Sequence, residues 1–139
     1  MRSPSLSKLT VMFLVSLACT GASVRTIAQN GHPLVGTWSG YWGADSDQRT
    51  RVLLLLEYDG DQITGIINPG PAPARLTRAS LNPETWTVVL EGDRQEADGS
   101  IVRYVIEGRI ENLTSPTQRA IAGSWMEGNS RGEFRVTLN

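Results

Sequence analysis

Residues 51–68 read RVLLLLEYDGDQITGIIN. Two short apolar runs lie on either side of Asp59-Gly60-Asp61, a combination that favours a tight hairpin turn. The rest of the chain after residue 28 repeats this arrangement: short runs rich in β-branched or aromatic residues alternate with clusters of Gly, Pro, Asn and Asp. No 3.6-residue periodicity of useful length is present. Such spacing is typical of an all-β barrel or sandwich.

The apolar runs predict eight strands joined by short links. They cover residues 35–42, 51–58, 62–68, 74–81, 85–92, 101–111, 119–127 and 132–138. No link is long enough to hold a crossover helix, so we expect every consecutive pair to be antiparallel. A meander of eight such strands can close on itself and so remove its edges. We therefore predict an all-β, eight-stranded antiparallel up-and-down barrel.

Alternation along the predicted strands defines an apolar face for the barrel interior. The expected interior positions are Trp38, Gly40, Trp42, Val52, Leu54, Leu56, Tyr58, Ile63, Gly65, Ile67, Trp86, Val88, Leu90, Val102, Tyr104, Ile106, Gly108, Ile110, Ile121, Gly123, Trp125, Phe134, Val136 and Leu138. In a meander, the loops after the first, third, fifth and seventh strands share one rim. The longest loops of the domain are among these, so we expect the opening for any ligand at that rim.

The first 28 residues have the order of a secretory signal peptide. A basic start is followed by the apolar run Leu9–Ala18 and then by small and polar residues up to Ala28. Because a bilayer span needs about 20 apolar residues, we predict a signal peptide at 1–28, with a cut after Ala22 as the alternative, and one domain at 29–139. The protein is then periplasmic or secreted, with no transmembrane span. Cys19 follows a sequence similar to the lipoprotein cleavage motif, so a lipid anchor in the envelope is the other possibility.

Charge and residue inventory argue against several classes of function. The chain has 13 Lys plus Arg and 14 Asp plus Glu. Three of the cations precede residue 29, which leaves ten Arg against fourteen carboxylates in the domain, a balance unlike that of a nucleic-acid binder. His32 is the only histidine and has no Cys, His or carboxylate at ligand spacing, so we expect no metal and no cofactor. No Ser or Cys nucleophile has a base available, so we expect no enzyme.

The first predicted strand opens with Val35-Gly36-Thr37-Trp38-Ser39-Gly40. This segment resembles the Gly-x-Trp start of lipocalin and calycin-like barrels. Ile63-Thr64-Gly65, the run from Ile121 to Trp125 and Gly132-x-Phe134 are similar to elements of small exported bacterial barrels of this kind, over residues 34–138. The resemblance implies that Trp38 plugs the closed end of the barrel. It also implies that an Arg from the last strand packs across this Trp, and Arg135 is the nearest match.

The candidate ligand-binding residues are Tyr41, Trp42, Tyr58, Arg78 and Tyr104, and the candidate structural residues are Trp38, Trp125 and Arg135. The aromatic cluster of Trp38, Tyr41 and Trp42 either fills the core or forms a stacking wall for an apolar or sugar ligand, with Trp42 nearer the mouth. Arg78 shares its parity with Leu76 and would then face inward, where a ligand carboxylate would be its partner. A bulge in this strand would instead leave Arg78 in solvent.

Two functions remain open at this point. The first is an exported, non-catalytic barrel that binds a small apolar or amphipathic molecule in its mouth. The second is a solid barrel that acts as a structural or protein-interaction module in the cell envelope, because eight strands are just wide enough either to be filled by side chains or to admit one small ligand. An enclosed apolar cavity above about 300 Å³ would favour the first function, and a packed interior the second.

Overall fold

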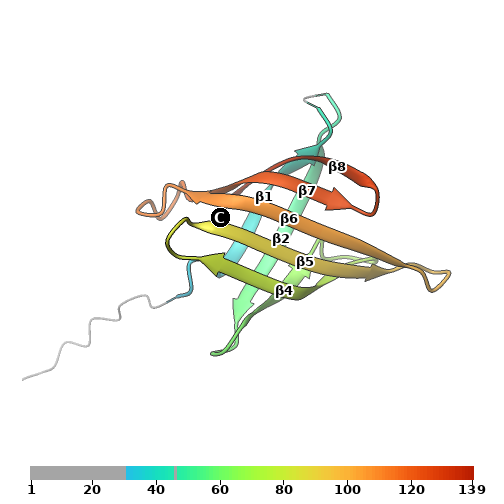
Figure 1. Ribbon diagram of the computed structural model, residues 1–139, viewed down its shortest axis with the longest axis horizontal. Helices are drawn as coiled ribbons and strands as arrows, with labels where there is room; N and C mark the ends of the chain where they lie inside the picture. Colours follow the sequence, from blue (N-terminus) through green and yellow to red (C-terminus); the bar gives the residue numbers. More distant parts are fainter. Residues whose placement is uncertain (1–30, 46) are drawn as a thin grey trace, which may run out of the picture.

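The computed structural model describes residues 31–45 and 47–139, so the predicted signal peptide and Cys19 lie outside the described residues. The described chain forms eight strands, which are β1 (Gly36–Gly43), β2 (Thr50–Tyr58), β3 (Ile63–Ile67), β4 (Ala74–Asn82), β5 (Thr87–Gln95), β6 (Ile101–Glu111), β7 (Ala120–Glu127) and β8 (Ser130–Leu138). They close into one barrel in sequence order, and every neighbouring pair is antiparallel (Figure 1). The predicted eight-stranded antiparallel up-and-down barrel is confirmed.

The predicted hairpin at residues 59–61 forms for a local reason. The Asp59 carboxylate accepts hydrogen bonds from the backbone N–H groups of Asp61 at 2.9 Å and Gln62 at 2.8 Å. These bonds satisfy donors that the turn would otherwise leave without a partner. They also hold the pKa of Asp59 below its ordinary value, with the Gln62 N–H as the largest cause.

The fifth strand is the one whose bounds depart most from expectation. Trp86 has a positive φ of 58° and belongs to the turn after β4, so the strand begins at Thr87 rather than at residue 85. It continues to Gln95, three residues beyond the predicted end. This extension places Arg94 inside the strand, on the same face as Leu90 and the buried Gly92.

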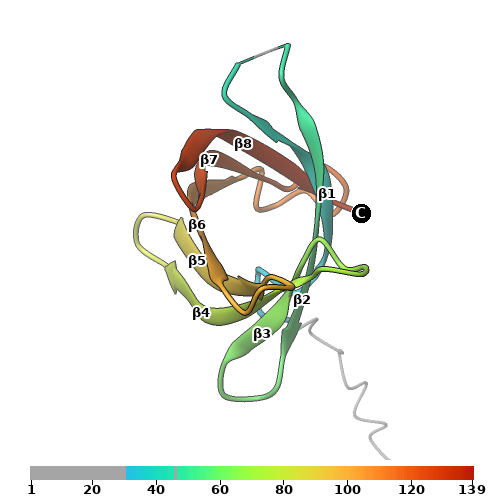
Figure 2. The same ribbon diagram turned by 90° about the vertical axis from the view of Figure 1, so that its right-hand side faces the viewer.

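The barrel interior is filled by apolar side chains. Every strand contributes to one buried cluster, which extends from Leu34 and Trp38 at one end to Trp42 and Trp125 at the other. Figure 2 shows β1 and β2 on one wall of this barrel, with β5 and β6 across from them. Among the described residues, no polar or charged side chain is fully buried. The lumen is therefore a hydrophobic core for most of its length.

The end of the barrel where β1 begins is closed by the short segment His32–Val35. Leu34 and Trp38 are 0% exposed, and the Trp38 indole donates a hydrogen bond to the Leu34 carbonyl at 2.8 Å. The Arg119 guanidinium donates to the carbonyls of Pro33 at 3.3 Å and Leu113 at 3.0 Å. The predicted interior position of Trp38 is thus confirmed, and Leu34 is buried beside it.

The prediction that Arg135 packs across Trp38 is wrong. It lies between Phe134 and Val136, both of which are buried, so strand alternation directs its side chain to the outer surface. There it forms an ion pair with Glu111 at 2.9 Å. Arg119, which immediately precedes β7, is the arginine that holds the closed end.

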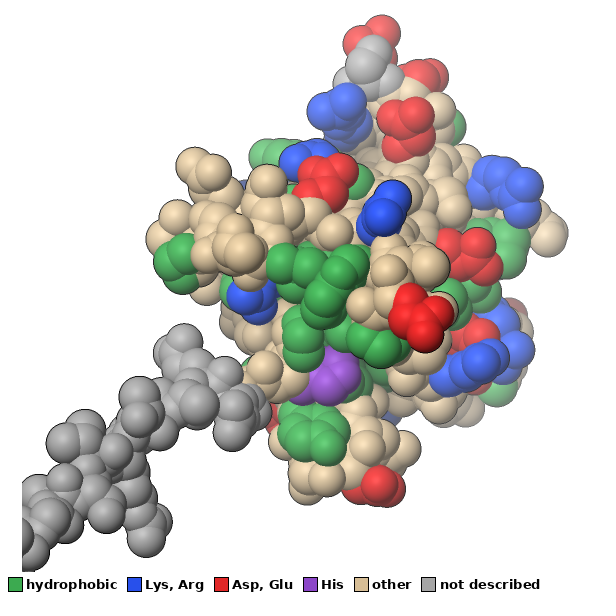
Figure 3. Space-filling view, turned by 60° about the vertical axis from the view of Figure 1, so that its left-hand side comes forward, with side chains coloured by type: hydrophobic (Ala, Val, Ile, Leu, Met, Phe, Trp, Pro, Cys, Tyr) green, Lys and Arg blue, Asp and Glu red, His purple; other side chains and the backbone are tan. Residues whose placement is uncertain are grey.

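Tyr58 also lies at the closed end, outside the core. Its ring is 45% exposed and stacks on His32 with 5.6 Å between ring centroids, and its hydroxyl donates to the Gly60 carbonyl at 2.9 Å. Figure 3 shows the histidine among hydrophobic side chains on this side of the molecule. The expected inward orientation of Tyr58 is therefore wrong, because the strand has passed the end of the core at this residue.

The closed end should be sensitive to pH through His32. Its Nδ1 accepts the Leu34 N–H at 3.3 Å, which requires the neutral ring, and partial burial lowers the pKa of His32 from its ordinary value of 6.5. As the pH falls below this value, the unfolded chain takes up a proton before the folded protein does, so stability should decrease. Thermal unfolding between about pH 7.5 and 5.5 should show this decrease. The His32→Asn variant keeps a hydrogen-bond acceptor that does not titrate, so its stability should not show this decrease. If the variant has the same pH dependence as the parent protein, His32 is not the group responsible.

Candidate functional site

The open end of the barrel has a stack of three aromatic rings as its floor. The rings of Trp42 and Trp125 are parallel to within 14° with centroids 3.8 Å apart, and the Tyr104 ring also stacks with Trp42, with 5.7 Å between centroids. All three side chains are buried. They come from β1, β7 and β6, and they occupy the space at the mouth where a small ligand would have to enter.

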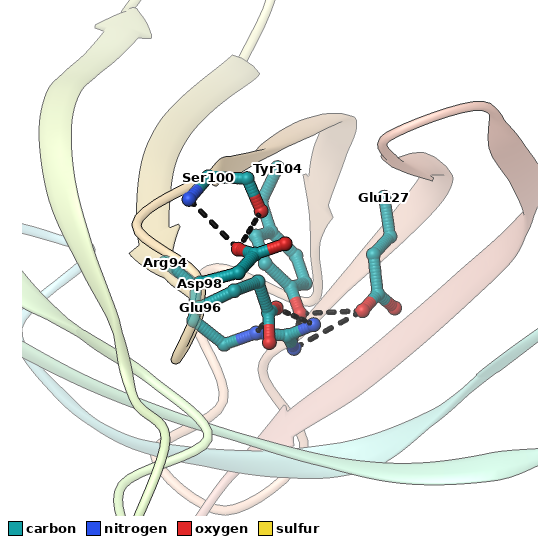
Figure 4. Close-up of polar contacts among 6 residues, drawn as sticks. All are labelled: Arg94, Glu96, Asp98, Ser100, Tyr104 and Glu127. Atoms are coloured by element: carbon teal, nitrogen blue, oxygen red, sulfur yellow. Dashed lines mark hydrogen bonds and ion pairs between the residues drawn. The ribbon is translucent and has the colours of Figure 1, made fainter.

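A cluster of four residues, which we call the mouth cluster, covers this floor: Arg94, Glu96, Tyr104 and Glu127 (Figure 4). Arg94 pairs with Glu96 at 2.7 Å and with Glu127 at 3.1 Å, and its guanidinium lies 5.3 Å from the centroid of the Tyr104 ring. Arg94 also donates to the Tyr104 hydroxyl, which in turn donates to Glu127 at 2.6 Å. Each charged or hydroxyl group of the cluster therefore already has a partner within it.

The electrostatics of the mouth cluster are those of a structural network. Burial is the largest cause that raises the pKa of Tyr104, and the hydrogen bond to Glu127 adds to it. The hydrogen bond to Glu96 raises the pKa of Arg94 above its ordinary value. Tyr104 therefore stays protonated and Arg94 stays charged at neutral pH, so neither residue supplies a base.

We expect Glu127→Gln to loosen the mouth cluster. The substitution removes the charge from the acceptor of both Tyr104 and Arg94, so the pKa of Tyr104 should fall while burial still holds it above its ordinary value. The free energy of unfolding should decrease by about 1 kcal/mol, because the ion pair is partly exposed. Ultraviolet titration of the tyrosines and urea unfolding measure both effects. Glu133→Gln, an exposed carboxylate on the neighbouring strand, is the control and should change neither.

Of the five predicted ligand-binding residues, the structure brings only Trp42 and Tyr104 together at the mouth. Tyr41 has the opposite parity to Trp42 and lies on the outer surface, 50% exposed. Arg78 also points outward: the β4–β5 register shifts between Leu76 and Arg78, and the bulge reverses the alternation. Its side chain is 66% exposed and pairs with Glu91 at 3.2 Å. Arg94 is instead the arginine that reaches the barrel mouth. The sequence prediction missed it because the predicted fifth strand ended at residue 92.

A groove of about 660 Å³ lies on the outside of the barrel, over β2, β1, β8 and β7. We call it the outer groove, and six of its side chains matter below: Ser39, Tyr41, Arg51, Glu133, Arg135 and Thr137. Its volume falls within the range of small-molecule sites, about 300–1,000 Å³. A second hollow, of about 570 Å³ around the Asn82–Thr85 turn, is also on the outer surface.

Strand register places three side chains of the outer groove in one row. Tyr41 on β1 is paired with Arg51 on β2 and with Arg135 on β8. Because neighbouring strands are about 4.8 Å apart, the backbone positions of the two arginines lie next to that of Tyr41, one on either side of it. Among the described residues, no carboxylate forms an ion pair with Arg51, whereas Arg135 is paired with Glu111.

Two glycines form part of the floor of the outer groove and explain its shape. A Cβ on Gly40 would lie 2.0 Å from the Arg135 carbonyl oxygen, and a Cβ on Gly123 would lie 2.0 Å from that of Glu107. Only glycine allows the neighbouring strands to approach so closely at these positions. The sequence alternation predicted both glycines at interior positions of the strands, and it did not predict a hollow beside them on the outer face.

Comparison of the chain with protein-family models, with curated proteins and with solved structures finds no match. Within the part of the chain that the structure describes, no three His, Cys, Asp or Glu side chains are grouped so that they could hold a metal ion. Across residues 31–45 and 47–139, no helix has the length and apolar character needed to cross a membrane.

Proposed function

We propose that this protein is a non-catalytic binding module that recognises its ligand in the outer groove, with a barrel interior that serves as a solid core. The observation that carries this proposal is the position of the ligand-sized hollow: about 660 Å³ on the outer face, lined by Tyr41 and arginines. Binding sites combine concave shape with a few well-placed polar groups. The outer groove has both.

The interior is lined by buried apolar side chains, and the charged groups that cover its mouth are already paired with one another. The stacked rings of Trp42 and Trp125 fill the mouth, and no polar or charged side chain among the described residues is fully buried below them. The mouth cluster holds two carboxylates and one guanidinium, so a fatty-acid carboxylate would meet a local excess of negative charge. These features disfavour an amphipathic ligand in the lumen.

A titration with apolar and amphipathic compounds tests this function. Tryptophan fluorescence should report no saturable binding of lauric acid or N-phenylnaphthylamine tighter than about 1 mM. A saturable response in the micromolar range that disappears in Trp125→Leu would place binding in the lumen and contradict the proposal. Tyr41→Ala, on the outside of the barrel, is the matched control for that variant.

One observation favours binding at the mouth as a second candidate. The Trp125 Nε1–H is buried and has no hydrogen-bond partner among the described residues. An unsatisfied buried donor costs about 1–3 kcal/mol, and an acceptor atom of a ligand would recover this. The same fluorescence titration decides between the two candidates.

We further propose that the barrel is lipocalin-like and that it is exported. The Gly-x-Trp start with Trp38 at the closed end and the closed eight-stranded meander support the first point. The order of charged, apolar and small residues in 1–28 supports the second.

Export predicts a processed chain. Mass spectrometry of the protein expressed with residues 1–139 should show a mature N-terminus near Gln29. A diacylated Cys19 would indicate the lipid-anchored alternative, and an intact Met1 in the soluble cytoplasmic fraction would contradict export.

A further inference from the structure

We infer that the ligand of the outer groove is a saccharide that carries carboxylate groups, such as a short chain of uronic acids. This inference rests on the proposed function and specifies the class of ligand. It is drawn from three properties of the groove: a half-exposed aromatic ring, an arginine that has no ion-pair partner among the described residues, and hydroxyl and carboxylate groups close by.

Tyr41 supplies an accessible flat surface. Its ring is 50% exposed, although the neighbouring Trp42 on the same strand is buried. The C–H face of a pyranose ring is apolar and packs against an aromatic face by dispersion, which leaves the sugar hydroxyls free for hydrogen bonds at their edges. A ring seated on Tyr41 would lie beside Arg51, its cross-strand partner on β2, whereas the guanidinium of Arg135, its partner on β8, is held by Glu111 of β6.

Arg51 is the group that selects for charge. It is exposed, and among the described residues no carboxylate forms an ion pair with it. A guanidinium matches the two oxygens of a carboxylate with two parallel hydrogen bonds. Arg135 is less available because it is held by Glu111 at 2.9 Å, so we assign the principal contact to Arg51.

The remaining groups favour a ligand rich in hydroxyls. Ser39 and Thr137 are cross-strand partners on the same outer face. Their hydroxyls donate to the Asn139 Oδ1 at 2.8 Å and to the Ser39 carbonyl at 3.4 Å, so toward a ligand they act as acceptors. Glu133 lies two residues before Arg135 on β8. The Glu133 carboxylate accepts hydrogen bonds from hydroxyl groups and repels anions. A polyphosphate or nucleic-acid backbone, with a charge on every unit, would therefore bind less well than a sugar chain whose carboxylates are spaced by neutral hydroxyls.

Calorimetric titration of the full domain with trigalacturonic acid tests the inference, and maltotriose serves as the neutral comparison. We expect a dissociation constant below about 1 mM for the acidic trimer, at least tenfold weaker binding of maltotriose, and weaker binding of the acid as salt is raised. Arg51→Gln and Tyr41→Ala should each weaken binding of the acid by about tenfold. Both residues are exposed, so both variants should fold.

Arg75→Gln is the matched control, because Arg75 is an exposed arginine on the outer face of β4. It should bind like the parent protein. An equal loss in Arg75→Gln and Arg51→Gln would mean non-specific attraction and would overturn the inference. Equal binding of the acidic and neutral trimers, with no effect of Arg51→Gln, would overturn the charge selectivity but leave the groove as the site if Tyr41→Ala still weakens binding. Absence of binding by either trimer at several millimolar would overturn the ligand class, while the proposed function is judged separately by the lumen titration.

Discussion

Trp38→Ala is expected to lower the free energy of unfolding by about 3–5 kcal/mol, through lost burial and the cavity left behind. The side chain is fully buried, and its indole N–H is bonded to the Leu34 carbonyl at 2.8 Å. The loss should therefore include release of the segment that closes this end of the barrel. Since small domains typically have a total stability of about 5–15 kcal/mol, the variant should be partly unfolded at 37 °C or at low denaturant concentration.

Urea unfolding of three variants separates the contributions of Trp38. Trp38→Phe keeps an aromatic ring but removes the donor to Leu34, and should cost less than the alanine variant. Tyr41→Ala on the same strand removes an exposed ring and should change stability by less than about 1 kcal/mol. A loss below about 1 kcal/mol for Trp38→Ala would show that the closed end does not depend on this residue.

Gly40→Ala is expected to have an effect of similar size for the opposite reason, overcrowding. The added Cβ would lie 2.0 Å from the Arg135 carbonyl oxygen and 2.8 Å from the Val136 Cα, both of them backbone atoms of β8. Backbone that is paired on both sides cannot move aside as a flexible side chain can. We expect a loss of about 3 kcal/mol or more, at the upper end of overpacking costs, because the β1–β8 pairing is what closes the barrel.

Gly31→Ala is the control for this substitution, since a Cβ at Gly31 has no atom within 4 Å. Its stability should lie within about 0.5 kcal/mol of the parent protein. If Gly40→Ala were equally neutral in urea unfolding, the close approach of β1 and β8 at this position would be wrong.

The sequence was sufficient to predict the architecture because its signals were redundant. Eight alternating runs, short links and turn residues such as Asp59 all agreed on a meander, and their agreement left little freedom in topology. The same alternation predicted the buried positions of Trp38, Trp42 and Trp125. It also indicated that Arg135 points outward, between two buried neighbours, but the resemblance to lipocalins led us to the other interpretation.

The candidate site was harder to predict because it depends on local departures from regular strands. One extra residue in β4 turned Arg78 outward. The strand β5 continues to Gln95, beyond the predicted end at residue 92, so Arg94 was left out of the predicted strand. Arg119 precedes β7 by one residue in the structure, and although the predicted strand 119–127 included it, its contacts with the carbonyls of Pro33 and Leu113 depend on segments for which alternation gives no information. The outer groove has Gly40 and Gly123 among its lining residues, and a sequence pattern reports that a glycine is present but not how closely the neighbouring strand approaches it.

The central claim is that the barrel recognises its ligand on the outside and is filled within. Amide and indole proton–nitrogen correlation spectra recorded during titration with trigalacturonic acid, and then with lauric acid, test it directly. We predict saturable shifts of the Tyr41, Arg51 and Arg135 amides with the saccharide, and no saturable shift of the Trp42 and Trp125 indole signals with either compound. Saturable shifts of those two indoles and of the Tyr104 amide, with the outer-groove amides unmoved, would contradict the claim.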